Sequence, residues 1–159
     1  MPDRFLHHRR ELAALIGPQS AALIPAASET VRNGDVTHEF RQDSDFFYLT
    51  GFHEPEAVAL IVPGYRDGDY HLFVRPRDRD MEIWNGHRAG VEGARERFQA
   101  DTAHEIDELD SMLPRLLLGR DSIYYRTGHS QHDERISRLI ARARNYHNRT
   151  GKTLPTVVR

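Results

Sequence analysis

The chain has 159 residues and a formal net charge of −2, from 22 basic and 24 acidic side chains. This length fits one globular domain that buries a core without disulfides or a structural metal. The sequence contains no cysteine, which excludes a disulfide scaffold, a cysteine-based zinc site and a thiol nucleophile, and fits a reducing compartment. The small net charge gives no overall electrostatic case for binding nucleic acid or an anionic membrane.

The amino-terminal stretch does not resemble a secretory signal. It carries charged residues where a signal peptide needs an apolar core. No run of the sequence approaches the roughly 18 apolar residues of a membrane-spanning helix. We therefore expect a soluble, cytoplasmic protein.

The first half of the chain predicts a helix followed by strands. Apolar side chains recur at helical spacing over residues 4–16 and a Gly-Pro pair follows, which predicts an amphipathic helix. Ser20–Pro25 is short and apolar between turn formers, as a buried strand would be. Residues 56–63 and 70–75 are two further apolar runs joined by a glycine-containing turn, which predicts a β-hairpin.

The second half predicts two helices and another strand. Thr102–Glu105 matches a capping box, so a helix is expected directly after it, kinked at Pro114 and ended by Gly119. Residues 122–126 resemble a strand, and residues 131–147 resemble a second amphipathic helix. Strands mixed with helices and including a hairpin predict an α/β fold with a mixed β-sheet flanked by helices.

Residues 27–55 form a long connection that is dense in polar, aromatic and turn-forming residues. Asp43 or Ser44 is expected to cap a short helix that runs through Leu49 and ends at Gly51. Two interpretations of the segment stay open: a capped turn that packs aromatic side chains onto the sheet, and a binding surface. The aromatic side chains concerned are Phe46, Phe47, Tyr48 and Phe52.

The same segment carries a family resemblance. The run FRQDSDFFYLTGF at residues 40–52, followed by EPEA at residues 54–57, closely resembles the amino-terminal domain of Xaa-Pro aminopeptidases, also called aminopeptidase P. The resemblance continues through residues 22–27 and through RDRDMEIWNGHRAG at residues 77–90. It covers essentially the whole chain in the family's order.

The resemblance implies a two-domain enzyme. Residues 1–159 correspond to the smaller amino-terminal domain, and a larger carboxy-terminal domain of the pita-bread fold is absent from this sequence. In that family the second domain binds two divalent ions, typically manganese, through two Asp, one His and two Glu. The enzyme removes the amino-terminal residue from peptides with proline in the second position. We expect no catalytic or metal-binding residue in this chain, and no hydrolysis by the domain alone.

The resemblance also implies partners and a substrate contact. The partners are the protein's own catalytic domain, further copies in a dimer or tetramer, and the peptide substrate. Trp84 is the only tryptophan; without the family it is as well explained as a core or interface aromatic. In related bacterial enzymes a tryptophan at this motif position reaches toward a neighbouring subunit's active site, so we expect Trp84 to line the substrate pocket, with Arg88 and His87 as secondary candidates.

Other candidate metal sites are better explained by structure. His129 and His132 have ligand-like spacing but no evident third ligand in the sequence. Pairs of aspartates two residues apart recur along the chain without the remaining ligands of a calcium loop. They are expected to be caps, turn residues and arginine partners: Asp43 with Asp45, Asp67 with Asp69, and Asp78 with Asp80.

Two rival functions are considered. The first is a catalytically inactive, stand-alone module of the same fold that binds proteins or forms oligomers. The second is nucleic-acid binding, because residues 126–152 carry seven basic and two acidic side chains. Residues 101–110 carry five acidic and no basic side chains, so pairing of the two faces between domains or subunits explains the charges equally well. We expect no nucleic acid and no membrane among the partners.

Overall fold

A mixed β-sheet forms the centre of the computed structural model, which describes residues 2–33, 36–37, 39–128, 130–152 and 155–158. Within these residues the sheet has six strands. In sheet order they are β6 (Thr102–Glu105), β5 (Tyr70–Val74), β4 (Val58–Ile61), β1 (Ser20–Pro25), β7 (Ser122–Tyr125) and β8 (Thr156–Val158). The short strands β2 (Val31–Asn33) and β3 (Val36–Thr37) pair separately.

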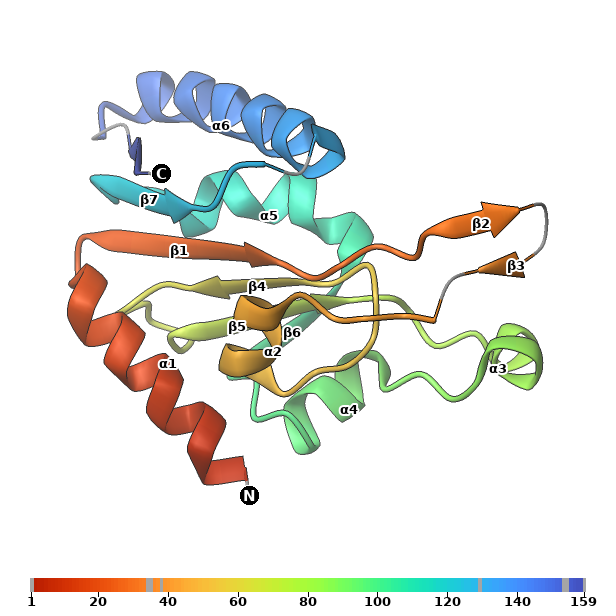
Figure 1. Ribbon diagram of the computed structural model, residues 1–159. Helices are drawn as coiled ribbons and strands as arrows, with labels where there is room; N and C mark the ends of the chain where they lie inside the picture. The colour runs from red at the N-terminus through yellow and green to blue at the C-terminus, as the bar shows by residue number, and fades with distance from the viewer. Residues whose placement is uncertain (1, 34–35, 38, 129, 153–154, 159) are drawn as a thin grey trace.

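Helices cover both faces of the sheet (Figure 1). One face carries α5 (Leu109–Leu116), which follows the 3₁₀ turn η1 (Ile106–Glu108), and α6 (Ser130–Thr150). The other face carries α1 (Pro2–Ile16), α2 (Ser44–Thr50) and α4 (Gly90–Glu96). A further helix, α3 (Arg79–Asn85), projects to one side of the sheet (Figure 1).

The strand pairing confirms the predicted mixed sheet. β1 pairs antiparallel with β4 and parallel with β7. β4 and β5 form the predicted antiparallel hairpin, with Val58 opposite Phe73. β5 pairs parallel with β6, and β7 pairs parallel with β8.

Side chains alternate between two buried clusters because successive residues of a strand face opposite sides of a sheet. Leu23 and Phe73 pack with α5 and α6. Ala22 and Leu72 pack against α1, α2 and α4 on the opposite face. The residues of β4 and β5 are all buried, as expected for strands covered on both sides.

The helix predicted after residue 43 is confirmed, including both of its ends. Asp43 is the N-cap, and its Oδ1 accepts a hydrogen bond of 2.9 Å from the backbone N–H of Phe46. Gly51 closes the helix in the left-handed conformation, with φ of 66°, which glycine adopts without the penalty of a Cβ. The amphipathic helix of the amino terminus and the long last helix are confirmed as α1 and α6.

The aromatic residues of this segment divide between core and surface. Phe46 and Phe52 are fully buried and meet edge to face, with ring centroids 6.4 Å apart. Phe47 and Tyr48 are exposed. The packing interpretation therefore holds for two of the four rings, and the other two lie on the surface of α2.

The helix predicted directly after residue 105 needs a correction. Thr102–Glu105 is not a helix cap but the edge strand β6, whose Thr102 lies opposite His71 of β5. The capping box begins at Glu105, whose backbone N–H donates to the Glu108 carboxylate over 2.9 Å. A T-x-x-E pattern suits a helix start in isolation, but the strand partner 31 residues earlier decides the outcome. Pro114 lies within α5, and the predicted kink stays a prediction.

Several elements lie where no element was expected. Residues 79–96 contain α3 and α4, and the last element that the structure describes is the strand β8. β2 and β3 form a small hairpin within the long connection. These pieces are at most seven residues long, too short for a periodic apolar pattern to emerge.

Candidate functional site

The strongest candidate residue, Trp84, lies on α3. This helix is part of a projecting segment, residues 76–90, which we call the α3 arm. Asp78 begins the helix, because its Oδ1 accepts hydrogen bonds from the backbone N–H groups of Asp80 (3.0 Å) and Met81 (3.3 Å). Gly86 ends it with φ of 83°. Figure 1 places the arm away from the sheet and its flanking helices.

The outer side chains of α3 are apolar and exposed. Trp84 is 84% exposed and Ile83 is 80% exposed. Trp84 is therefore not a core aromatic of this domain. Large exposed apolar side chains on an ordered helix are typical of surfaces that are covered by a partner or a ligand.

Glu82 is the polar centre of the arm. Its Oε1 lies 2.9 Å from Nε of Arg77, and its Oε2 lies 3.2 Å from Nη2 of the same guanidinium. Nδ1 of His87 lies 3.1 Å from Oε2, and the backbone N–H of Arg88 donates to Oε1 over 3.3 Å. The hydrogen bond from Arg77 is the main cause that lowers the pKa of Glu82 to about 2, so the carboxylate stays ionised at neutral pH.

The two secondary candidates, His87 and Arg88, have structural contacts inside the arm. His87 is largely exposed but is bound to Glu82. Arg88 is half-buried, and its Nη1 donates to the carbonyl oxygen of Pro76 over 3.2 Å. The structure therefore brings these residues to the same arm as Trp84, with Arg88 directed toward the base of the arm.

The sequence alone does not identify Glu82 as a candidate residue. Residues 77–88 contain an arginine, a glutamate, and a glycine followed by two basic residues. Such spacing has no periodicity, so nothing in it identifies which acidic residue accepts the hydrogen bonds.

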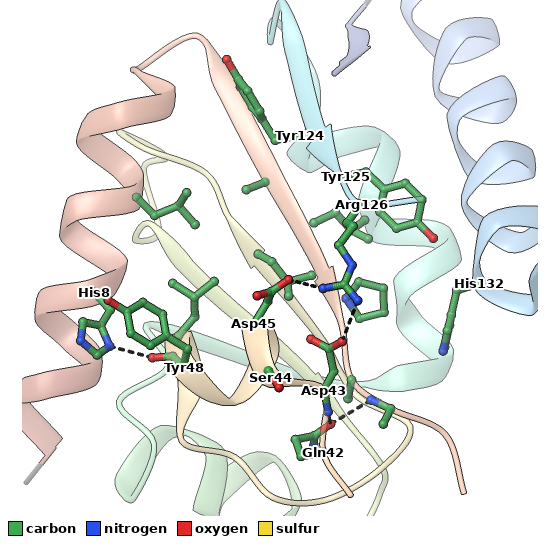
Figure 2. A pocket seen from close by; sticks show the side chains of 18 of the residues that line it. His8, Gln42, Asp43, Ser44, Asp45, Tyr48, Tyr124, Tyr125, Arg126 and His132 are labelled. Atoms are coloured by element: carbon green, nitrogen blue, oxygen red, sulfur yellow. Dashed lines mark hydrogen bonds and ion pairs between the residues drawn. The ribbon is translucent and has the colours of Figure 1, made fainter. Parts of the chain in front are cut away.

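A second candidate surface is a groove of about 1070 Å³ on the α1 and α2 side of the sheet (Figure 2). Its apolar lining includes Leu15, Ile24, Tyr124 and Val158. No described helix covers β7 and β8 on this side (Figure 1). Leu15 is among the most exposed apolar residues of the described chain.

Polar contacts hold the walls of the groove. Arg126 pairs with Asp45, at 2.5 Å between Nη1 and Oδ2, and with Asp43, at 3.6 Å between Nη2 and Oδ2 (Figure 2). On the facing wall, the imidazole of His8 stacks on the ring of Tyr48 with centroids 3.7 Å apart, and its Nδ1 lies 2.8 Å from the Tyr48 carbonyl oxygen. These contacts join α1, α2 and the end of β7 into one surface.

The residues considered as metal ligands have other contacts where the structure describes them. Among the described residues, no group of three or more His, Cys, Asp or Glu is arranged to hold a metal ion. His129 lies outside the described residues, and Nε2 of His132 lies 3.3 Å from Oγ of Ser28 at the groove. Five of the six aspartates serve as predicted: Asp43 and Asp78 are helix caps, Asp45 and Asp67 pair with arginines, and Asp69 accepts a turn N–H from Gly64. Asp80 lies in the first turn of α3.

The basic and acidic segments noted in the sequence meet within the domain. Asp110 of α5 accepts from Arg135 of α6 over 2.9 Å, and Nη1 of Arg142 lies 4.0 Å from its other oxygen. Part of the basic face of α6 is therefore neutralised by the acidic segment of the same chain. In the described residues no helix has the length and apolarity needed to cross a membrane.

Comparison with known proteins identifies the family. The family model described as "Aminopeptidase P, N-terminal domain" matches residues 5–125. The Xaa-Pro aminopeptidase of Escherichia coli is 41% identical over 130 residues, which cover 79% of this chain and 29% of that protein. The Xaa-Pro aminopeptidase of Haemophilus influenzae is 39% identical over 123 residues, 77% of this chain and 29% of that protein.

Solved structures extend the match to nearly the whole fold. An aminopeptidase of Pseudomonas aeruginosa superposes with a TM-score of 0.93 and 43% identity, covering 99% of this chain and 36% of that one. A zinc-substituted Escherichia coli aminopeptidase P in complex with product superposes with a TM-score of 0.90 and 35% identity over the same shares. This chain thus spans about a third of the length of these relatives. It belongs to the aminopeptidase P amino-terminal domain family.

Proposed function

We propose that this chain is the amino-terminal domain of a cytoplasmic, manganese-dependent Xaa-Pro aminopeptidase, which removes the first residue from peptides with proline in the second position. In this proposal the divalent ions and the catalytic residues belong to a separate carboxy-terminal domain of the longer protein. The amino-terminal domain shapes the substrate pocket and helps to assemble a dimer or tetramer. The relatives that bear the name Xaa-Pro aminopeptidase support the reaction.

The observation that carries the role of this domain is the exposure of Trp84 on α3, the helix of a projecting arm (Figure 1). An indole ring offers a flat apolar face that packs well against a proline ring or an apolar first residue. In the isolated domain this face is exposed to water, so covering it is favourable. We therefore assign Trp84 to the substrate pocket of a neighbouring subunit.

The groove beside α1 and α2 supports a larger assembly. Its apolar lining and the open side of β7 and β8 supply the kind of surface on which a second domain of the same chain packs. The arm and the groove involve different residues, so the domain has separate surfaces available for a substrate and for a catalytic domain.

The test uses the full-length protein with Xaa-Pro peptides. We expect Trp84→Ala to raise KM or lower kcat, with a loss in kcat/KM of roughly tenfold or more, as for the loss of a buried aromatic contact. Metal content should stay unchanged, since no ligand is removed. Ile83→Ala is the matched control, because Ile83 is nearly as exposed on the same helix. Unchanged kinetics in Trp84→Ala would contradict the proposed role.

A mixing experiment tests the action between subunits. Full-length Trp84→Ala is combined with a second full-length variant that keeps Trp84 and carries an inactivated catalytic domain. If the arm acts on the neighbouring subunit, mixed oligomers show more activity than the two variants show separately. Absence of recovery, with mixed oligomers verified by mass, would contradict action between subunits.

The size of the native gene product distinguishes the enzyme from the inactive module. A denatured mass several times that of the 159-residue chain agrees with the proposed enzyme. A mass equal to that of the chain would favour a stand-alone module that binds partners without catalysis.

A further inference from the structure

The α3 arm is ordered without an apolar core of its own. Within the described residues, α3 makes none of the extensive contacts that join the other helices to the sheet or to one another, and it stands apart from them in Figure 1. Ile83 and Trp84, its largest apolar side chains, are exposed. The position of Trp84 is therefore not fixed by packing, and the polar contacts of the arm must account for it.

One carboxylate joins the two chain segments that lead into and out of α3. Arg77, before the helix, donates to both oxygens of Glu82, at 2.9 and 3.2 Å. After the helix, the backbone N–H of Arg88 donates to Oε1 over 3.3 Å, and Nδ1 of His87 lies 3.1 Å from Oε2. A two-pronged arginine–carboxylate pair restricts orientation more than a single contact does. Only 12% of the Glu82 side chain is exposed.

The backbone conformation at Gly86 allows these contacts. With φ of 83° and ψ of 169°, Gly86 adopts a conformation that other residues rarely reach. This turn sends His87 and Arg88 back toward Glu82. The segments before and after α3 thus both contact the side chain of Glu82.

The base of the arm is fixed by different groups. Arg88 Nη1 donates to the carbonyl oxygen of Pro76 over 3.2 Å, which joins the two ends of the arm. Oε1 of Glu54 accepts the backbone N–H of Ala89 over 2.6 Å, which attaches the arm to the loop before β4. These contacts hold the base in place but do not reach α3 itself, so the direction of the helix depends on Glu82.

We infer that Glu82 is a positioning residue, which fixes the direction of Trp84 by tying α3 to both ends of the arm. The positioning stands on the contacts above, while its effect on peptide hydrolysis rests on the proposed function. An arm that is already ordered loses less conformational entropy when its tip enters a pocket. Glu82 therefore favours substrate binding without touching the substrate.

The first experiment measures the motion of the arm in the 159-residue chain. Trp84 is its only tryptophan, so the anisotropy decay of tryptophan fluorescence reports on this arm alone. We expect Glu82→Gln and Glu82→Ala to enlarge the fast, nanosecond part of the decay. Glu96→Gln, the same change at an exposed position of α4, should leave the decay unchanged.

The thermal midpoint, followed by circular dichroism, separates local loosening from unfolding. We expect it to change little in both Glu82 variants, because α3 contributes little to the packing of the sheet. An unchanged decay in Glu82→Ala would overturn the inference. A faster decay together with loss of the folded circular dichroism signal would also overturn it, because Glu82 would then support the whole domain.

The second experiment is a double-mutant cycle in the full-length protein. We expect Glu82→Ala to raise KM on Xaa-Pro peptides by roughly two- to tenfold, the factor that corresponds to ordering one mobile segment. Combined with Trp84→Ala, it should add nothing, because Glu82 acts through Trp84.

The two proposals fail differently in this cycle. If Trp84→Ala alone changes nothing, the proposed function fails, and the anisotropy decay decides on Glu82. If Trp84→Ala reduces kcat/KM and Glu82→Ala adds its full effect to it, the positioning role is overturned and the proposed function stands.

Discussion

Arg9 lies over the ring of Tyr70, with its guanidinium carbon 4.2 Å from the ring centroid. The guanidinium also donates to the carbonyl oxygen of Leu49 over 2.8 Å and to Oε1 of Gln99 over 3.3 Å. Arg9 is only 4% exposed, and this burial lowers its pKa from the usual value. One buried cation thus joins α1, α2 and β5.

Removal of this cation should destabilise the domain. We expect Arg9→Ala to lower the free energy of unfolding by about 2–4 kcal/mol, through lost charge-assisted hydrogen bonds and a lost cation–π contact. Urea denaturation of the 159-residue chain measures the change. Arg10→Ala, at the neighbouring exposed position, should stay within about 0.5 kcal/mol of the unmodified chain. Equal losses in the two variants would contradict a specific role of Arg9.

Gln42 is a second buried polar residue that connects separate segments of backbone. Its Oε1 accepts from the N–H groups of Ala27 (2.8 Å) and Asp43 (2.9 Å). Its Nε2 donates to the carbonyl oxygens of Phe52 (3.3 Å) and Glu54 (2.8 Å). The amide therefore fixes both ends of the segment that contains α2.

A carboxylate at this position should be strongly destabilising. Gln42→Glu keeps the shape of the side chain but removes both donors and buries a charge. We expect a loss of about 2–5 kcal/mol in the free energy of unfolding at neutral pH, from two unpaired carbonyls and desolvation. The loss should shrink on acidification, because a protonated carboxyl regains a donor. Arg41→Ala, at an exposed neighbour, is the control; a pH-independent loss in Gln42→Glu would contradict this explanation.

Local patterns in the sequence predict the elements whose signals are complete within a short window. The strand at residues 20–25, the hairpin of β4 and β5, and the capped helix α2 all follow from adjacent residues. The helix cap predicted at Thr102–Glu105 is wrong because the same four residues are compatible with a helix cap and with a strand. The partner strand β5 decides between them, and its contribution is not visible in the local sequence.

In the candidate site, too, only the residue with a local sequence signal could be predicted. Trp84 is identified by the family motif and by being the only tryptophan. The roles of Glu82 and Gln42 could not be predicted, since their partners are largely backbone groups and side chains in irregular segments. Such contacts depend on where the chain turns, and turns of this kind have no periodic signature.

Two glycines with similar φ angles should respond differently to an added methyl group. Gly17 and Gly51 have φ of +82° and +66°. A Cβ at Gly17 would meet nothing within 4 Å, whereas a Cβ at Gly51 would lie 2.5 Å from Cε2 of the Phe5 ring. Both changes carry the cost of a left-handed conformation, but only one also displaces a neighbour.

We therefore expect Gly17→Ala to cost about 1–2 kcal/mol of unfolding free energy. Gly51→Ala should cost about 1 kcal/mol more, at the low end of overpacking penalties, because Phe5 is only half-buried and can shift. Urea denaturation of the two variants side by side checks the difference. Equal losses would mean that the contact with Phe5 contributes nothing.

His71 and His104 form a stacked pair on β5 and β6, with ring centroids 6.4 Å apart. Nε2 of His71 lies 2.9 Å from the carbonyl oxygen of Gly68, and Nδ1 contacts the hydroxyl of Thr102. Burial lowers the pKa of His71 from its usual value, although the Gly68 carbonyl acts in the opposite direction. Burial likewise lowers the pKa of His104.

Depressed histidine pKa values predict a loss of stability on acidification. The unfolded chain binds protons at these sites from about pH 6.5 downward, before the folded chain does. The free energy of unfolding should therefore be highest above that pH and decline as the pH falls through it, until the folded histidines are protonated too. His71 contributes a slope no steeper than about 1.4 kcal/mol per pH unit. Urea denaturation from roughly pH 8 to pH 5 tests the decline. His71→Gln should flatten the decline. The same slope in this variant and in the unmodified chain would rule out His71 as its origin.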